Sequence, residues 1–206
     1  MTDINELQET VTLLHDKASR KRRSAAKRLR KLKSSLAGPY LLSALKEEVR
    51  DPRTWETQYQ MIMALAECEY LSALPFLQEL VEQPLQAAIL YISLGDAIIR
   101  LSQRTRNLDL LIQFLEAKHD MLVAGGIRAI AMLKIIPNQE IIERIIRYAR
   151  NTSHNEIQLW TSAAAAGWQG DIVDDFLEDA GNSSNSNVRR AAQASKNKKY
   201  LDWHPL

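Results

Sequence analysis

The stretch from Asp51 to Pro84 has the pattern of two antiparallel helices joined by a short turn. In its first half, apolar residues recur at three-to-four spacing, as on one buried helical stripe: Tyr59, Ile62, Leu65 and Ala66. In its second half, Pro75 suits the first turn of a helix, where the missing N–H costs nothing, and Pro84 ends the pattern. We expect one helix from Thr54 to Glu67 and a second from about Leu74 to Gln83.

Segments similar to the second of these helices recur along the chain. They start at Pro39, Pro75, Leu108, Pro137 and Asp171, at intervals of 36, 33, 29 and 34 residues. A helical period in this range indicates a solenoid of helix pairs, in which no pair can bury its apolar face without its neighbours. The sequence therefore predicts an all-α fold without a sheet, with about eleven or twelve helices in about five pairs. We expect one domain over residues 1–206, with an N-terminal capping helix over 1–18 and a C-terminal cap and tail over 185–206.

Two kinds of segment carry a resemblance to a known family. RRSAAKRLRKL and NVRRAAQA resemble the first helix of HEAT repeats, of the short HEAT-like kind found in phycobilisome lyases. ALPFLQELVEQP is similar to the matching second helix, its proline included. The resemblance covers nearly the whole chain and implies a right-handed superhelix whose second helices line a concave binding face. It implies a fold and leaves the activity open.

Composition narrows the class of protein. The chain has 206 residues, of which 46% are hydrophobic and 25% charged, as expected of a soluble globular protein. It has no apolar run of about 18 residues, so we expect no membrane span. The first ten residues are acidic and polar, unlike a secretory signal. The single cysteine, Cys68, suits the reducing cytoplasm, and its neighbours Glu67 and Glu69 favour a buried structural thiol over a nucleophile.

Enzymatic chemistries find little support in the sequence. HEAT-like metal hydroxylases carry repeated His-Glu pairs, whereas this chain has only His15-Asp16 and His119-Asp120, at different places in the repeat. Helix caps and surface positions explain these pairs better than a shared metal does. The sequence has no glycine-rich phosphate loop, nucleophile elbow or CxxC pair. We therefore expect a non-enzymatic protein without a metal or other cofactor.

Several single residues allow both a structural and a functional interpretation. HEAT-like alkylpurine DNA glycosylases use tryptophans on their concave face, but we interpret Trp160 and Trp168 as core residues beside an alanine run. Asp96 interrupts an apolar helix, and we expect it at the helix surface or bonded to a neighbouring backbone rather than acting as a buried functional acid. Ser153 and Glu156 fit a capping box at the start of a helix.

The charges are strongly segregated along the chain. Its net charge is +2, yet residues 17–33 contain ten basic residues and no acid. Four of these basic residues would form one exposed stripe opposite Leu29 and Leu32: Arg23, Lys27, Arg30 and Lys31. Such a stripe could contact a few phosphates of a nucleic acid, an anionic membrane surface, or an acidic protein.

The body of the protein is acidic instead. If the HEAT-like geometry holds, its second helices bring eight carboxylates to or near the concave face: Glu79, Glu82, Asp109, Glu116, Asp171, Asp174, Asp175 and Glu178. In the fourth second helix, by contrast, Glu140 can pair with Arg144 and Glu143 with Arg147. The plain alternative is a solvated acidic surface that only keeps the protein soluble.

From these features we predict a cytoplasmic, armadillo-like HEAT-repeat scaffold that acts through protein–protein interaction. Its acidic concave surface would bind a basic protein partner, as a chaperone, an adaptor or a toxin-immunity protein does. The alternative is a nucleic-acid-binding or DNA-repair protein of the HEAT-like glycosylase type, led by the basic helix. The direction in which the positive charge faces separates the two, because nucleic acid needs a continuous basic groove.

Overall fold

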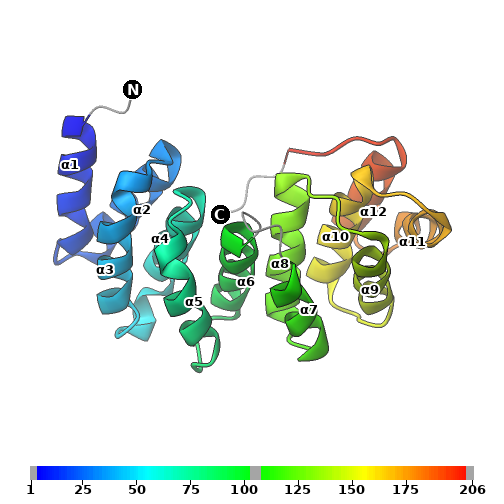
Figure 1. Cartoon of the computed structure of the whole chain (residues 1–206), viewed down its shortest axis with the longest axis horizontal. Coiled ribbons are helices and arrows are strands. Elements are labelled where there is room, and N and C mark those ends of the chain that lie inside the picture. Colours follow the sequence, from blue (N-terminus) through cyan, green and yellow to red (C-terminus); the bar gives the residue numbers. More distant parts are fainter. Residues whose placement is uncertain (1–3, 103–107, 203–206) are drawn as a thin grey trace. The chain divides into compact units, whose positions relative to one another are not determined.

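The computed structural model describes residues 4–102 and 108–202, which are helical throughout with short connections and contain no β-strand (Figure 1). The prediction of an all-α fold is confirmed, and twelve α-helices lie within these ranges. The chain divides into two compact units, Met1–Asn107 and Leu108–Leu206. Within the described residues, no helix is long and apolar enough to cross a membrane.

The first unit is a row of helices joined by tight turns. Its helices are α1 (Ile4–Thr12), α2 (Ser19–Leu32), α3 (Gly38–Glu48), α4 (Trp55–Glu67), α5 (Leu74–Val81) and α6 (Ala88–Ser102). Helix α4 packs between α2 and α6, while α3 packs against α4 and α5 against α6. The two helices predicted between Asp51 and Pro84 correspond to α4 and α5. Pro75 lies in the first turn of α5, as its lack of an N–H requires.

The second unit has two layers of helices. It contains α7 (Asp109–Glu116), α8 (Asp120–Leu133), α9 (Gln139–Arg150), α10 (Asn155–Ala164), α11 (Asp171–Gly181) and α12 (Ser186–Lys196). In one layer α10 packs between α8 and α12, and in the other α9 packs between α7 and α11. The second layer matters most for function, because it holds most of the predicted acidic residues.

Several helices end in a left-handed residue that is not glycine. Lys33, Glu69, Lys118, Lys134 and Lys198 have φ between 50° and 56°. After α8, for example, the N–H of Ile135 donates to the carbonyl of Ile130 at 3.0 Å, which closes the helix with a Schellman turn. A lysine pays a small conformational cost in this region, but its ammonium interacts favourably with the negative end of the helix dipole.

The core confirms some of the single-residue interpretations. Trp168 is fully buried and Trp160 is 7% exposed, so both pack in the core as predicted. Trp55 lies at the start of α4 and is 36% exposed, and Trp203 lies outside the described residues. The Cys68 thiol is buried, and this burial raises its pKa to about 11, with Glu67 adding to the effect. Its predicted structural character is therefore confirmed.

The structure corrects two local predictions. Asp96 is fully buried in α6, so a position at the helix surface was wrong, and its carboxylate accepts a hydrogen bond from Arg100 Nε, one turn further on, at 2.9 Å. The predicted capping box does not form either. The N-cap of α10 is His154 rather than Ser153, and Glu156 accepts from the Trp160 indole N–H at 2.9 Å. In both cases the carboxylate accepts a hydrogen bond from a side chain one turn further along the same helix.

Candidate functional site

The basic helix α2 directs several of its charges toward its neighbours. Arg22 donates two hydrogen bonds to the Glu48 carboxylate of α3, at 2.5 and 2.8 Å. It donates a third to the carbonyl of Asp16 at 2.8 Å. The Glu48 side chain is only 3% exposed, so the pair is largely shielded from water. Its hydrogen bonds to Glu48 are the main cause of the raised pKa of Arg22. This arginine therefore has a structural role.

The predicted basic stripe is split by ion pairs to α4. Arg23 pairs with Glu56, and Arg30 pairs with Glu67 at 3.1 Å. The Arg30 side chain is only 14% exposed. Lys27 and Lys31, by contrast, are exposed. The expectation of four exposed cations in one stripe was therefore wrong for Arg30 and holds for Lys27 and Lys31, because α4 brings carboxylates alongside α2.

A cavity of about 320 Å³ next to α2 is lined by four carboxylates, but each already has a cationic partner. Besides Glu48, which binds Arg22, Asp16 binds Lys21 at 2.9 Å and Glu47 binds Arg50 at 2.7 Å. Asp51 binds Arg53, whose hydrogen bonds lower the pKa of Asp51 to about 2. This cavity therefore offers no ready set of ligands for a cation.

The predicted acidic residues are all exposed, but they belong to different units. Glu79 and Glu82 lie at α5 in the first unit; the other six lie in the second unit, on α7 and α11. On α11, Glu178 pairs with Lys196 of α12 at 2.5 Å, and its neighbour Asp179 pairs with Arg150 of α9 at 3.1 Å. Asp171, Asp174 and Asp175 have no such partner among the described residues and form an acidic patch at the start of α11, hereafter the α11 patch.

Helix α9 places arginines between the two acidic helices of this layer. Arg144 pairs with Glu116 of α7 at 2.6 Å, rather than with Glu140 on its own helix as predicted. The predicted pair of Glu143 with Arg147 is present, at 3.2 Å. In the second unit, therefore, a basic helix interrupts the predicted acidic surface, and the sign of the charge alternates from α7 through α9 to α11.

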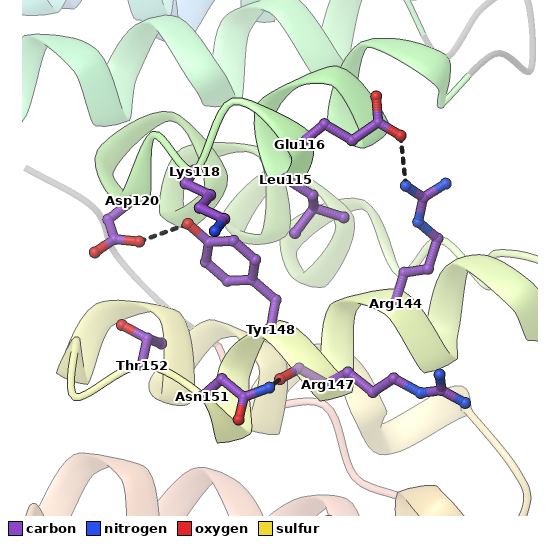
Figure 2. A pocket seen from close by; sticks show the side chains of 9 residues that line it. All are labelled: Leu115, Glu116, Lys118, Asp120, Arg144, Arg147, Tyr148, Asn151 and Thr152. Carbon is purple, nitrogen blue, oxygen red and sulfur yellow. Dashed lines mark hydrogen bonds and ion pairs between the residues drawn. The ribbon is translucent and has the colours of Figure 1, made fainter.

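A groove of about 620 Å³ lies between the end of α7 and helix α9 (Figure 2). Its lining consists of Leu115, Glu116, Lys118, Asp120, Arg144, Arg147, Tyr148, Asn151 and Thr152. Figure 2 shows the pair of Glu116 with Arg144 on one side and the pair of Asp120 with Tyr148 on the other, with Leu115 between them and Lys118 next to Tyr148. We call this the α7–α9 groove.

Tyr148 is held rigidly in the groove. Its hydroxyl donates to Asp120 Oδ1 at 2.6 Å, across the junction between α9 and α8. Partial burial, together with this hydrogen bond, raises the pKa of Tyr148 well above its usual range. The phenol therefore stays protonated at neutral pH, and its ring provides a fixed apolar wall.

Neither histidine lines the α7–α9 groove, although Asp120 of the His119-Asp120 pair does. His119 is the N-cap of α8, where its Nδ1 accepts from the Leu122 N–H at 3.5 Å, in agreement with the predicted capping role. His15 belongs to the first unit and is exposed. Within the described ranges, no group of three or more His, Cys, Asp or Glu side chains is placed to hold a metal ion.

The α7–α9 groove was missed by the sequence analysis, although one signal could have indicated part of it. Glu116 precedes Arg144 by 28 residues and Asp120 precedes Tyr148 by 28, close to the 29-residue interval between the two repeats there. Comparing side chains one repeat apart would have suggested both pairs. Lys118 has no such signal, since its place in the groove follows from the left-handed turn after α7.

Comparisons with known proteins leave the identity open: no protein-family model matches the chain, and no curated protein matches its sequence. The resemblance to HEAT repeats therefore stays a prediction based on the repeat pattern.

Proposed function

We propose that this chain is a non-enzymatic, cytoplasmic scaffold of the HEAT-repeat kind, and that the α11 patch is where it binds a basic protein partner. The observation that carries this proposal is the contrast between the α11 patch and α2. Asp171, Asp174 and Asp175 are exposed without a partner among the described residues, while three arginines of α2 are engaged by carboxylates of α3 and α4.

Like charges repel each other on the exposed face of α11. Asp171 and Asp175 are four residues apart, and such a pair destabilises a helix by about 0.2–0.5 kcal/mol, although the helix dipole stabilises Asp171 at the first position. A basic partner removes that repulsion when it binds, and opposite charges accelerate its approach. The α11 patch therefore supports a binding role better than a structural one.

The nucleic-acid alternative loses support from the same comparison. Duplex binding depends on several lysines and arginines that each neutralise a phosphate. With Arg22, Arg23 and Arg30 held in ion pairs, binding through α2 has to rely on its exposed cations Arg20, Lys27, Arg28 and Lys31. Few phosphate contacts give weak binding that salt abolishes.

The test compares two variants with the same net charge. One carries Asp171→Asn, Asp174→Asn and Asp175→Asn; the control carries Glu6→Gln, Glu9→Gln and Asp202→Asn, which are exposed acids elsewhere. Binding of a labelled lysine-rich peptide is followed by fluorescence anisotropy at low and physiological salt. We expect the α11 variant to lose about tenfold in affinity, equivalent to about 1.4 kcal/mol, and the control to bind like the native protein.

Equal losses in the two variants would show that only net charge matters and would refute the proposal. A parallel titration with duplex DNA, together with a base-release assay on alkylated DNA, tests the alternative. We expect DNA binding to vanish near physiological salt and no base to be released. Tight DNA binding at physiological salt, or any released base, would favour the hypothesis that the protein acts in DNA repair.

A further inference from the structure

We propose that the α7–α9 groove is a second binding site, of the opposite charge preference, which takes an extended acidic peptide segment of a partner protein. The inference rests on the lining of the groove and does not depend on the α11 patch. Lys118 would bind a carboxylate of the peptide, and Leu115 and Tyr148 would contact the apolar part of the segment.

Lys118 is the cation of the groove that lies next to Tyr148 (Figure 2). It is exposed and has no carboxylate partner among the described residues. The left-handed backbone of Lys118, with φ of 52°, is tied to the turn that closes α7: the His119 N–H donates to the Phe114 carbonyl at 3.3 Å. The ammonium is therefore presented from a fixed backbone.

The rest of the groove is already organised. Arg144 is held by Glu116 and Tyr148 by Asp120. At the far end, Asn151 Nδ2 donates to the Arg147 carbonyl at 2.9 Å, and Thr152 Oγ1 accepts from the His154 N–H at 3.1 Å. Because these side chains are anchored, a ligand has few rotamers to immobilise, which lowers the entropic cost of binding.

Arg147 supplies a second cation at the rim. Its side chain is 70% exposed, and its pair with Glu143 lies within one helix. An exposed pair of this kind contributes little stability, so Arg147 can exchange Glu143 for an incoming carboxylate at small cost.

The dimensions favour a peptide. Along α9 the lining runs from Arg144 to Asn151, which at 1.5 Å per residue is about 10 Å. An extended chain of about three residues covers that length. An acidic side chain on Lys118, an apolar residue against Leu115 and Tyr148, and a second acid near Arg147 fit this span.

The charges of the lining argue against a phosphate dianion. Strong phosphate sites converge several donors on one anion. Here Arg144 and the Tyr148 hydroxyl are committed to Glu116 and Asp120, and the remaining cations, Lys118 and Arg147, lie apart in the groove and do not converge on one anion (Figure 2). A carboxylate carries a single charge on an apolar stem and suits one free ammonium beside an apolar wall.

The experiment uses the full chain and a labelled peptide whose glutamates flank a leucine, with a counterpart in which glutamines replace the glutamates. Binding is measured by fluorescence anisotropy at low salt. We expect the acidic peptide to bind and the neutral one not to. Lys118→Asn, which keeps a residue that tolerates the left-handed turn, should weaken binding about tenfold. Arg147→Gln should weaken it about threefold, and Glu143→Gln, which frees Arg147, should strengthen it about threefold.

The matched control is the double change Lys27→Gln and Lys31→Gln in α2, which removes two exposed cations from the first unit and should leave the affinity unchanged. Circular dichroism checks that each variant is folded. The proposal is overturned if the acidic peptide fails to bind at millimolar concentration, or if the α2 control loses as much as Lys118→Asn. Competition by inorganic phosphate at the same molar concentration as the peptide would also overturn it, because the site would then select a simple anion.

Discussion

Helices α2 and α11 carry runs of opposite charge, and they differ in which of these charges the neighbouring helices pair. Within α2, Arg22, Arg23 and Arg30 are paired with carboxylates of α3 and α4, and Arg30 is largely buried. On α11, the carboxylates of the α11 patch point into water, and the adjacent helices supply one cation each, Arg150 and Lys196, to other acids. A charged run in a sequence therefore stays available to a partner only where the neighbouring helices leave it unpaired.

The difference follows from which helices pack alongside. Helix α2 lies against α4, whose Glu56 and Glu67 face it, and α3 adds Glu48. Helix α11 lies against α9 and α12, whose cations reach only the second half of the acidic run. The paired arginines of α2 thus act on stability, while the charges in the α11 patch remain available to a partner.

The largest effect that separates the two helices is expected at Arg22. Arg22→Met leaves Glu48 as a buried carboxylate without its cation, so we expect the free energy of unfolding of the first unit to fall by about 3 kcal/mol. Adding Glu48→Leu removes the stranded charge and should restore most of the loss. Urea unfolding followed by circular dichroism measures both.

Lys27→Met is the matched control for this change, since Lys27 is an exposed lysine of the same helix. It should change stability by less than about 0.5 kcal/mol. If Arg22→Met costs no more than Lys27→Met, the α2 ion pairs are not structural, and the contrast between α2 and α11 fails.

Cys68 offers a second way to compare the two helices, because it reports on the first unit alone. Its thiol is buried after α4 and lies 3.6 Å from the carbonyl oxygen of Leu29 in α2. Since folding raises the thiol pKa to about 11, the native state disfavours the reactive thiolate, and this contribution to stability is lost as pH rises from about 9 through 11. Near pH 8, labelling by a disulfide reagent therefore requires opening of the first unit.

We expect Arg22→Met to accelerate labelling of Cys68 about a hundredfold, which corresponds to the loss of about 3 kcal/mol. The triple change in the α11 patch should leave the labelling rate unchanged, because it lies in the other unit. Equal acceleration by both would mean that the two units open together, and the two helices could not then be compared separately.

The sequence predicts the fold much better than it predicts the surface. Apolar spacing and Pro75 place α4 and α5 nearly to the residue, since burial of a helical stripe leaves a direct trace in the sequence. The helix ends are harder to predict from the sequence, because five turns have Lys or Glu in the left-handed conformation. Glycine at these positions would have been the recognisable signal.

The ion pairs were missed for a different reason. Arg22 and Glu48 are 26 residues apart and join the two helices of one pair, α2 and α3. Arg30 and Glu67 are 37 residues apart and join the first helices of neighbouring pairs, α2 and α4. When each helix is considered alone, such charges are expected to be exposed to solvent. Opposite charges about one repeat apart could have revealed the pair of Arg30 with Glu67, whereas the spacing of Arg22 and Glu48 gives no such signal. The α11 patch could be predicted from the sequence because its three carboxylates lie on one helix.

The smallest expected effects lie within the α11 patch itself, where two physical terms oppose each other. Asp171 is the first residue of α11, so its carboxylate is stabilised by the helix dipole; Asp171→Asn should lower the free energy of unfolding by about 0.5 kcal/mol. Asp175 lies one turn further on, where the dipole is weaker and repulsion from Asp171 remains; Asp175→Asn should raise it by about 0.3 kcal/mol. The opposite signs can be measured as shifts in the thermal midpoint at low salt, and high salt should reduce both by screening. If both changes destabilise equally at every salt concentration, the carboxylates are held by folded-state contacts, and the α11 patch would resemble α2 after all.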